Sequence, residues 1–413
     1  LIPVQLTVIK CVIDFGSIAE IFIDEIPAYV ELLAIAASSS YFKASPTTQV
    51  VIDFPVSVEV NEWAYALLDE GLREFRFQNN LDLLRAPMIV SIDKERASSG
   101  NKKLDENLLL VPIGGGKDSA TTIEILQKTD KKIVGFSIGK FASIDQTAKV
   151  ASLEMVRVTR TLDATLIDWN DQGALNGHVP VTAITSTLAT LAAYCIGAGS
   201  VVMSNEASAN EPTRVIDEIE VNHQYSKSFQ AEILLRNALN AHTKDTVDYF
   251  SLLRVLSEFQ IFSIFSSAIR FHKTFTSCNR VFKIDKKERS KSWCGECDKC
   301  RFVFIGLSAF LNIEEVTKIF GKNLLKDETY TQGFLDLIGM GEGKPFECVG
   351  TIGETVLLMK KALNKVDLNE ELKTTLDSIK DIEFLSQNLQ LGVEFGVDNF
   401  VPTDLLNAIE ELK

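Results

Sequence analysis

From residue 108 onward, the chain alternates short apolar runs with longer segments in which apolar residues recur every three or four positions. The short runs predict strands: LLLVPI (108–113), KKIVGFSIG (131–139), DATLIDW (163–169) and SVVMSN (200–205). The longer segments predict helices over 119–129, 143–159 and 180–197. This alternation predicts an α/β fold with a doubly wound, mostly parallel sheet and helices on both of its faces. Ligands of such sheets bind outside the carboxyl ends of the strands.

Residues 1–100 carry a different pattern, in which apolar and polar positions alternate with a period of two. The segments VQLTVIKCVIDF (4–15) and TQVVIDFPVSVEV (48–60) therefore predict antiparallel strands, and EWAYALLDEGLREFRFQ (62–78) predicts a helix. A polar, turn-rich stretch at 91–107 marks a boundary. The pattern divides the chain into four parts: an N-terminal β-rich (α+β) domain at 1–100, the α/β domain at 108–234, a helical lobe at 235–349 and a helical tail at 350–413.

The composition narrows the function classes. Apolar residues make up 46% of the 413 residues and charged residues 24%, as in ordinary globular proteins. No apolar run is long enough for a membrane span and no basic-then-apolar export signal is present, so we expect a cytoplasmic protein with no membrane partner. A net charge of -14 repels phosphate backbones, which argues against a nucleic-acid partner and favours a small-molecule substrate. The composition predicts no oligomeric state.

Three glycines and Lys-Asp-Ser stand where the first predicted strand passes into a helix. A Walker-type phosphate loop requires Ser or Thr after Gly-Lys, and a dinucleotide fingerprint requires a further Gly or Ala; neither pattern fits. The segment resembles the SGGxDS signature of the PP-loop ATP pyrophosphatase superfamily, enzymes that cleave ATP to AMP and pyrophosphate. Five of the six positions match, and Gly replaces the first Ser. The predicted ATP-binding residues are Gly114, Gly115, Gly116, Lys117, Asp118 and Ser119.

Physical chemistry supports this interpretation of the loop. Glycines let backbone amides approach phosphate oxygens, and a helix N-terminus adds free N–H groups and a favourable dipole. Ser119 can cap the helix and donate to a phosphate, Lys117 adds a charge, and Asp118 can help to hold Mg²⁺. The alternative is a strand-to-helix turn that uses glycine for its geometry alone. The resemblance implies an adenine nucleotide alpha hydrolase-like fold for this part of the chain.

Four of the seven cysteines fall within 23 residues: Cys278, Cys294, Cys297 and Cys300. Their neighbours are largely polar, so four unligated core cysteines do not account for them well, and four thiolates suit a closed tetrahedral zinc site. An iron–sulfur cluster is the rival, because C-x2-C runs also bind those. The arrangement resembles the 7-cyano-7-deazaguanine synthase branch of the same superfamily, where it holds structural zinc. Its expected role here is to fix a helical lobe beside the ATP site.

Four further polar loops contain candidate functional groups: GHVPVTAITS (177–186), SNEASANEP (204–212), VNHQYSKSFQAE (221–232) and GEGKPFECVGT (341–351). Taken alone, each is more readily interpreted as a connecting loop. In order with GGGKDS and WCGECDKCRFVF, the segments SNEASANEP, VNHQYSKS and KPFECVGT resemble the bacterial UDP-N-acetylmuramoyl-L-alanyl-L-glutamate epimerase (MurL) family over roughly residues 108–360 and, more loosely, the N-terminal region. The resemblance implies that the terminal L-Glu of a UDP-muramoyl dipeptide becomes D-Glu while ATP is converted to AMP and pyrophosphate. Such an enzyme supplies D-Glu for peptidoglycan and thereby for the cell wall and cell shape.

The implied chemistry is coherent. Adenylating the carboxylate removes its charge, so a side-chain base can take the neighbouring Cα proton and reprotonation from the other face inverts the centre. The predicted catalytic residues are His223, Tyr225, Lys227 and Cys348, the last needing a lowered pKa that Lys344 can provide. The predicted substrate-binding residues are Asn205, Glu206, Asn210, Glu211, Arg214, Gln224, Ser226, Arg270 and Lys344.

Three other functions fit parts of the pattern. An amide- or nitrile-forming enzyme of the same superfamily would also release AMP, but the long N-terminal region and the 344–351 segment argue against it. A tRNA-modifying thiolase would need a basic surface, which the net charge disfavours. A non-catalytic nucleotide- and zinc-binding module would bind ATP without turning it over.

Overall fold

The computed structural model describes residues 12–14, 27–93, 102–243, 246–283, 286–341, 344–363, 365, 370–378 and 398–412. Its centre is a six-stranded sheet in the order β1-β6-β5-β4-β7-β10. Five of these strands run parallel: β4 (Asp105–Pro112), β5 (Lys132–Ile138), β6 (Glu154–Thr161), β7 (Ala198–Met203) and β10 (Asp248–Ser251). The short β1 (Val12–Asp14) pairs antiparallel with β6 at one edge. The predicted α/β class with a mostly parallel sheet is therefore confirmed.

The order of the strands fixes where a ligand can enter. The chain builds outward from β4 to β5 and β6 on one side, then crosses to place β7 and β10 on the other side. This reversal puts a topological switch point between β4 and β7, where the connections leave toward opposite faces and open a crevice at the carboxyl ends. The loops after β4 and β7 are the glycine loop and the 204–212 segment.

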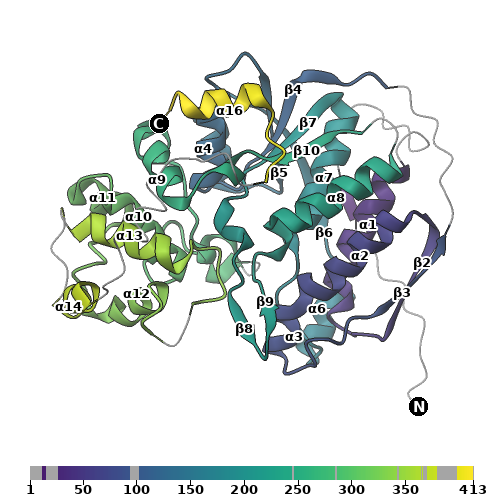
Figure 1. Ribbon diagram of the computed structural model, residues 1–413, viewed down its shortest axis with the longest axis horizontal. Helices are drawn as coiled ribbons and strands as arrows, with labels where there is room; N and C mark the ends of the chain where they lie inside the picture. The colour runs from purple at the N-terminus through teal and green to yellow at the C-terminus, as the bar shows by residue number, and fades with distance from the viewer. Residues whose placement is uncertain are drawn as a thin grey trace.

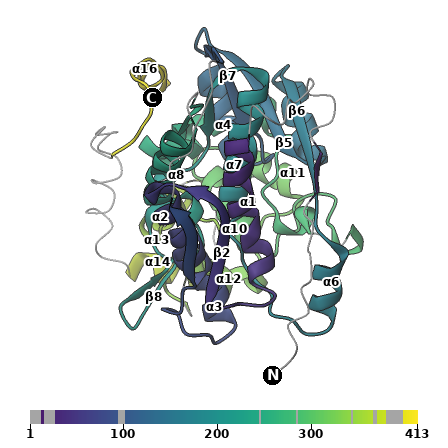
Figure 2. The same ribbon diagram turned by 90° about the vertical axis from the view of Figure 1, so that its right-hand side faces the viewer.

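Side chains alternate across the sheet into two cores. Leu109 and Val111 of β4 face one core, and Leu110 between them faces the other. The first core contains α4 (Lys117–Leu126), α5 (Ala142–Val150) and α9 (Glu258–Ser267). Helices on the second side are α1 (Pro27–Phe42), α2 (Val58–Asp69), α7 (Val181–Ile196) and α8 (Phe229–His242). Figure 2 shows α1 beside α7. The helices that precede the 91–107 stretch in the sequence therefore share one hydrophobic core with the sheet and helices that follow it.

The predicted antiparallel pairing in the N-terminal region is wrong. The strands β2 (Gln49–Val56) and β3 (Met88–Asp93) pair parallel, and α2 and α3 (Arg73–Gln78) form the crossover between them, as parallel strands require. The alternation over 48–60 extends beyond the strand because Ser57 caps α2, accepting from Val60 N at 3.4 Å. Helices occupy more of 27–93 than strands do. Most of the strand predicted at 4–15 lies outside the described residues.

Two predictions within the α/β part are also wrong. Residues 163–169 form helix α6 (Ala164–Asp171) rather than a strand, because Asp163 caps its first turn by accepting from Thr165 N at 2.9 Å. The helix predicted over 143–159 ends at Val150, and β6 follows. Ser152, with a φ of 55°, makes the turn between them.

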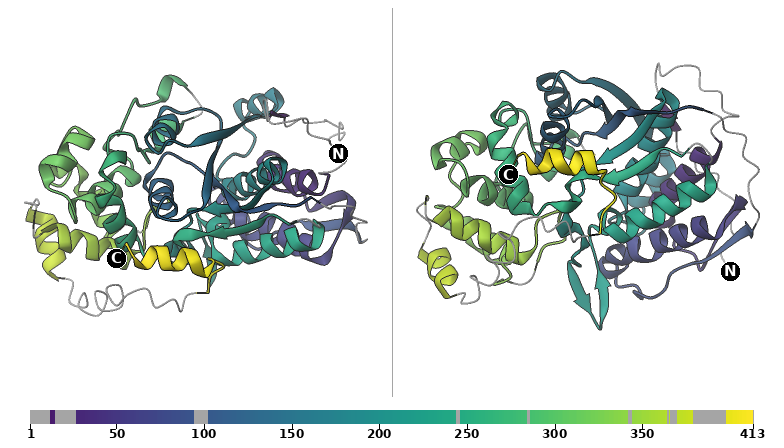
Figure 3. Two further views of the ribbon diagram at one scale, coloured as in Figure 1. Left: turned by 90° about the horizontal axis from the view of Figure 1, so that it is seen from above. Right: turned by 45° about the horizontal axis from the view of Figure 1, so that its top comes forward.

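The remaining helices form a lobe beside the carboxyl ends of the strands (Figure 1). Its main elements are α10 (Asp298–Ser308), α11 (Ile313–Phe320), α12 (Thr331–Leu337), α13 (Ile352–Leu363) and α14 (Glu370–Ser378). The lobe is continuous with the α4 side of the sheet through one hydrophobic core. The last helix, α16 (Thr403–Glu410), packs on α4 (Figure 3). Its residues Leu405 and Ile409 are buried. No described helix is long and apolar enough to cross a membrane.

Candidate functional site

The glycine loop follows β4 at the switch point and leads directly into α4. Gly114 is exposed, and a Cβ placed on it would have no heavy atom within 4 Å. Gly115 has a φ of +80°, a conformation that L-residues with side chains rarely adopt. Gly116 is the N-cap of α4, and no described side chain caps the helix, so its first N–H groups are left for an anionic ligand. The predicted capping by Ser119 is wrong, since its hydroxyl donates to Gly116 O at 3.3 Å.

Lys117 points into the protein rather than out of the loop. Its side chain is only 4% exposed, and its Nζ lies 2.7 Å from Glu258 Oε2 and pairs with Asp118 as well. The ammonium also lies 4.9 Å from the ring centre of Phe262. Burial acts to lower the pKa of Lys117, but Asp118, Glu258 and Glu206 outweigh it and raise the pKa above its usual range. Lys117 therefore carries the predicted positive charge, but its ammonium group forms ion pairs with Asp118 and Glu258.

A segment from the lobe covers one side of the glycine loop. Thr276 N donates to Gly115 O at 2.8 Å, and Ser277 Oγ lies 2.7 Å from the position of a Cβ on Gly116. The next residue, Cys278, is the first member of the cysteine cluster. Thr276 and Ser277 therefore connect the cysteine cluster directly to the glycine loop.

The four predicted cysteines converge. Their sulfur atoms all lie within 4.8 Å of one another, with Cys300 Sγ 3.7 Å from Cys294 Sγ and 3.4 Å from Cys297 Sγ. A zinc ion with Zn–S bonds of about 2.3 Å requires sulfur separations of about 3.8 Å. Cys294 Sγ also accepts from the N–H groups of Glu296 and Cys297, at 3.3 and 3.4 Å. This spacing suits one tetrahedral ion, because several iron atoms between the thiolates would hold them farther apart.

Glu206 and Lys227 connect the loop region to a second reactive cluster. Glu206 follows β7 and is 3% exposed, and its Oε1 lies 3.6 Å from Lys227 Nζ. Lys227 also donates to Gln224 Oε1 at 3.2 Å. Burial acts to raise the pKa of Glu206, but Lys227 and Lys117 lower it, so the carboxylate stays charged. One carboxylate thus faces both the lysine of the glycine loop and the lysine of the 221–232 segment.

The second cluster contains Cys348, His223, Lys227 and Glu74. The Cys348 thiol lies beside His223, with which it shares a hydrogen bond, and beside Lys227. His223 Nδ1 lies 2.5 Å from Glu74 Oε2, and its ring centre lies 4.4 Å from that of His178. Three of the four predicted catalytic residues therefore come together from segments far apart in the chain.

The electrostatics of this cluster favour a thiolate–imidazolium pair. Burial acts to raise the pKa of Cys348, but the charges of Lys227 and Lys299 and the hydrogen bond with His223 lower it to about 5. Burial acts to lower the pKa of His223, but Cys348 and Glu74 raise it to about 9. His178 behaves oppositely, because burial and the neighbouring cations lower its pKa to about 3 and keep it neutral. Lys344, the predicted cause of the lowered thiol pKa, instead lies 3.0 Å from Glu211.

Comparison with known proteins decides the family. Residues 14–252 match the MurL N-terminal domain, and residues 274–381 match the MurL C-terminal domain. The chain belongs to the MurL family. It is 38% identical over 335 residues, 80% of this chain and 73% of the relative, to a protein of Micromonospora sp. named UDP-N-acetyl-alpha-D-muramoyl-L-alanyl-L-glutamate epimerase. Proteins of the same name in Salinispora tropica and Xanthomonas oryzae pv. oryzae are 37% and 35% identical. These matches cover 93% and 83% of this chain, and 84% and 76% of those relatives.

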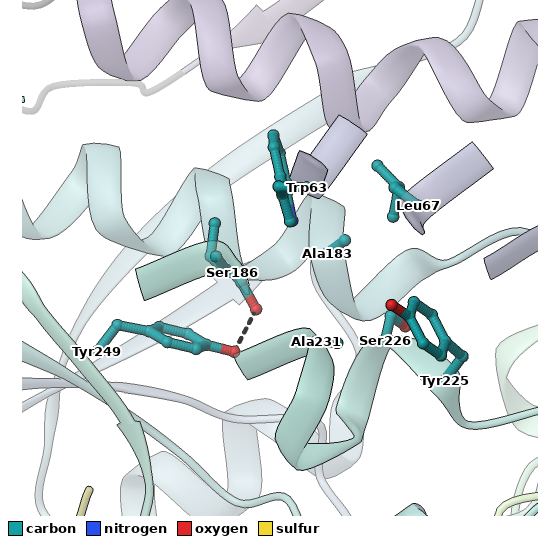
Figure 4. Close-up of a pocket in the computed structure, with 9 residues that line it drawn as sticks. Trp63, Leu67, Ala183, Ser186, Tyr225, Ser226, Ala231 and Tyr249 are labelled. Carbon is teal, nitrogen blue, oxygen red and sulfur yellow. Dashed lines mark hydrogen bonds between the residues drawn. The ribbon is translucent and has the colours of Figure 1, made fainter. Parts of the chain in front are cut away.

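Within this MurL chain, the predicted catalytic residue Tyr225 and the predicted substrate-binding residue Ser226 lie apart from the Cys348–His223 cluster. Both line a small cavity of about 10 Å³ between α2, α7 and α8 (Figure 4), which has room for one water molecule. Ser186 and Tyr249, 2.8 Å apart, lie on the same cavity. Burial and the neighbouring carboxylate of Glu70 raise the pKa of Tyr225 above its usual range, so its hydroxyl stays neutral.

Several predicted substrate-binding residues have structural partners. Asn205 donates to Ser251 Oγ at 2.9 Å, and Asn210 Oδ1 accepts from the first N–H of α8 at 2.7 Å. Arg270 pairs with Glu124 at 2.6 Å on the outer side of α4, and the structure does not bring it to the loop.

Arg214 lies on an aromatic pair next to the reactive cluster. Its guanidinium is 6.0 Å from the ring centre of Phe77 and 5.1 Å from that of Phe346. Phe346 precedes Cys348 by two residues, and Phe77 follows Glu74 by three. The hairpin of β8 (Arg214–Ile216) and β9 (Ile219–Val221) thereby links the N-terminal region to the Cys348 segment.

Sequence reasoning missed Glu74, His178, Glu258 and Ser277. His178 stands in the 177–186 segment and is one of only four histidines, a signal that could have identified it. Glu258 follows Ser257 in a capping-box pattern, and the sequence suggests only that structural role. Glu74 looks like one more carboxylate on an amphipathic helix, so nothing local distinguishes it.

Proposed function

We propose that this chain is an ATP-dependent epimerase that converts the terminal L-Glu of UDP-MurNAc-L-Ala-L-Glu into D-Glu for peptidoglycan synthesis. The three relatives carry the name of that activity and align with most of the chain. The observation that carries the proposal is a chain of contacts between the Cys348–His223 pair and the glycine loop. Cys348 lies beside Lys227, Lys227 pairs with Glu206, and Glu206 faces Lys117 of the glycine loop. This arrangement brings a strong candidate base close to a phosphate-binding turn.

The glycine loop is the proposed PP-loop of an ATP pyrophosphatase-type site. Its open Gly114, its left-handed Gly115 and the free N–H groups of α4 suit the triphosphate of ATP. Magnesium, when bound, would offset phosphate charge. Asp118, with 31% of its side chain exposed, and Glu206, whose Oε2 has no hydrogen-bond partner among the described residues, offer the oxygen donors that it prefers.

The four-cysteine cluster is the proposed zinc site, and its role is structural. A closed set of four thiolates leaves no open position for chemistry. When bound, zinc would supply only cross-linking of the lobe. Cys278 would thereby be fixed, and with it the Thr276–Ser277 chain that lies against Gly115 and Gly116.

Adenylation explains why an epimerase needs ATP. A carboxylate resists loss of the neighbouring proton because the product would carry two adjacent negative charges. Transfer of AMP to the carboxylate oxygen, with pyrophosphate leaving, yields an ester-like group that can accept the electron pair from the broken C–H bond. Hydrolysis of that group then releases AMP and restores the carboxylate of the inverted residue.

Within this reaction, Cys348 is the proposed base. Its thiolate takes the Cα proton, forming an S–H bond, while the C–H electron pair moves into the activated carbonyl. Proton return to the opposite face requires an acid, and His223 and Lys227 are the adjacent cations. Glu206 holds Lys227 in the charged form that such an acid requires.

The decisive experiment incubates the protein with ATP, Mg²⁺ and UDP-MurNAc-L-Ala-L-Glu, and then determines the chirality of the glutamate after hydrolysis. We expect D-Glu, together with AMP and pyrophosphate. Unchanged L-Glu with ATP consumption that depends on ammonia would favour an amide-forming enzyme instead. No ATP turnover with any acid would favour a binding module.

A pair of variants separates the two half-reactions. Cys348→Ala should still form AMP and pyrophosphate from ATP and the dipeptide, but should leave the glutamate as L and exchange no Cα deuterium in D₂O. Cys195→Ala is the control: it changes another partly exposed cysteine that is distant from Cys348 in the sequence, and it should epimerise normally. Full epimerisation by Cys348→Ala would remove Cys348 from the proposed mechanism.

A further inference from the structure

Glu74 is a buried carboxylate that the proposed reaction has not yet used. It lies in α3 and is 3% exposed. Its Oε1 accepts from Gln78 Nε2 at 2.9 Å, and its Oε2 lies 2.5 Å from His223 Nδ1. No described Lys or Arg forms a salt bridge with it, so His223 is the principal cationic partner available to this charge. Burying a carboxylate in this way is costly unless its partner is charged as well.

The short helix that bears Glu74 is held rigidly. Arg76, two residues later and 3% exposed, donates to Leu68 O at 2.9 Å and to Leu83 O at 3.1 Å. It also pairs with Asp69 Oδ1 at 2.8 Å. These bonds tie both ends of the 68–83 segment to one guanidinium. The carboxylate of Glu74 is therefore presented from a fixed backbone rather than from a loose surface turn.

His223 is held from two directions. Its backbone N–H donates to Thr213 Oγ1 at 3.1 Å, and its ring donates through Nδ1 to Glu74. Because Nδ1 is taken, Nε2 is the nitrogen left to face Cys348. The stack of Arg214 on Phe77 and Phe346 links α3 to the Cys348 segment and keeps the three side chains in register.

We propose that Glu74 is a positioning residue for the Cys348–His223 pair: it orients the imidazole through Nδ1, places a buried carboxylate against it, and makes the N-terminal region part of the active site. The catalytic meaning of the pair rests on the proposed function, whereas the placement of Glu74 does not. The arrangement is Cys–His–Glu, with each member from a different part of the chain, and it gives the N-terminal region a chemical role as well as a packing role.

Other charged groups face the pair and enter the test. Lys227 and Lys299 act on Cys348, Glu347 interacts with both Cys348 and His223 and lies 3.9 Å from Lys299, and His178 packs on the His223 ring. His178 stays neutral and so adds no charge. Glu74, His178 and His223 also offer ligand atoms within 4.8 Å of one another, but the direct 2.5 Å contact between Glu74 Oε2 and His223 Nδ1 favours a hydrogen bond between these two side chains.

The test measures alkylation of Cys348 by iodoacetamide across pH, with the Cys348 peptide quantified by mass spectrometry. It needs neither ATP nor the dipeptide, so its outcome is independent of whether the protein epimerises glutamate. Glu74→Gln keeps the size of the side chain but removes its charge. We expect the midpoint of alkylation to move upward by about one pH unit or more. The control, Glu62→Gln, alters a carboxylate on α2 that has no part in the cluster and should leave the midpoint unchanged.

Two further variants exclude a merely structural effect. Glu74→Asp keeps the charge and should give a midpoint closer to the wild type than Glu74→Gln does. In a His223→Gln background, Glu74→Gln should cause no additional shift, because the group through which it acts is gone. If the proposed function also holds, Glu74→Gln should lower kcat with KM for the dipeptide unchanged. An unmoved midpoint in Glu74→Gln, equal shifts for Asp and Gln, or a remaining shift in the His223→Gln background would each overturn the proposal.

Discussion

Gly114 and Gly115 are adjacent in the glycine loop, yet the structure gives them opposite tolerance to a side chain. At Gly114, an added Cβ meets nothing within 4 Å. At Gly115, the φ of +80° is unfavourable for alanine, and the Cβ lies 2.5 Å from Ser143 Oγ and 3.2 Å from the backbone N of Ile144. Gly115→Ala should therefore destabilise the protein, whereas Gly114→Ala should not.

The size of the effect follows from two contributions. A left-handed conformation costs an alanine about 1–2 kcal/mol, and forcing a methyl group into filled space costs about 1–3 kcal/mol. We expect Gly115→Ala to lower the free energy of unfolding by about 2–5 kcal/mol, and Gly114→Ala to change it by less than about 0.5 kcal/mol. Gly114→Ser, which recreates the superfamily signature, should be tolerated equally well.

Urea unfolding followed by tryptophan fluorescence measures these differences, and a double variant separates their causes. Ser143→Gly removes the nearest obstructing atoms, so Gly115→Ala/Ser143→Gly should regain the steric share of the loss but retain the conformational share. ATP affinity, measured by calorimetry on each variant, should fall most for Gly115→Ala, because its amide positions shift. Equal losses at Gly114 and Gly115, or no recovery in the double variant, would refute the loop geometry on which this reasoning depends.

Further predictions concern the other parts of the site. Epimerisation should have a bell-shaped pH profile, falling as pH drops through about 5, where the Cys348 thiolate is protonated, and as pH rises through about 9, where His223 loses its proton; a profile flat from about 4 to about 10 would contradict the thiolate–imidazolium pair. Cys300→Ser should lose zinc, as measured by metal analysis, and weaken ATP binding because the 276–278 chain is released; unchanged zinc content would contradict the assignment of the cysteine cluster. Arg270→Ala should leave KM for the dipeptide unchanged, since Arg270 pairs with Glu124; a raised KM would return it to the substrate site.

The parts of the site that could be predicted from the sequence are those whose residues stand close together in the sequence. The glycine loop is a contiguous strand–turn–helix, and three of the four cysteines stand within seven residues. The same locality explains the errors in the fold. The apolar alternation in 163–169 resembles a strand, but Asp163 at its start caps a helix, and the 48–60 alternation continues past the cap at Ser57. In each case, a capping residue marks the start of a helix, a local signal that the alternation of apolar residues does not include.

The reactive cluster around Cys348 and His223 was only partly predictable from the sequence. His223 and Cys348 could be predicted because each is a reactive side chain in a polar loop that carries several such groups. Glu74 could not, since its helix is amphipathic and its burial depends on the N-terminal segment closing over the 221–232 loop. Tyr225 was included for its neighbours in sequence, but the 3-10 turn Tyr225–Lys227 directs it toward α2 and α7 instead.

The distribution of these residues makes the candidate site dependent on segments from several parts of the described chain. Glu74 comes from the N-terminal helices, Glu206 and His223 from loops at the carboxyl side of the sheet, and Cys348 from the segment that leads into α13. The cysteine cluster acts on the glycine loop through Thr276, and Arg214 joins Phe77 to Phe346. The cations that lower the pKa of the Cys348 thiol come from the 221–232 loop and from α10, so they surround it only when the lobe is docked on the sheet. In the unfolded chain the thiol would not have this lowered pKa, because Lys227, Lys299 and His223 surround it only in the folded state.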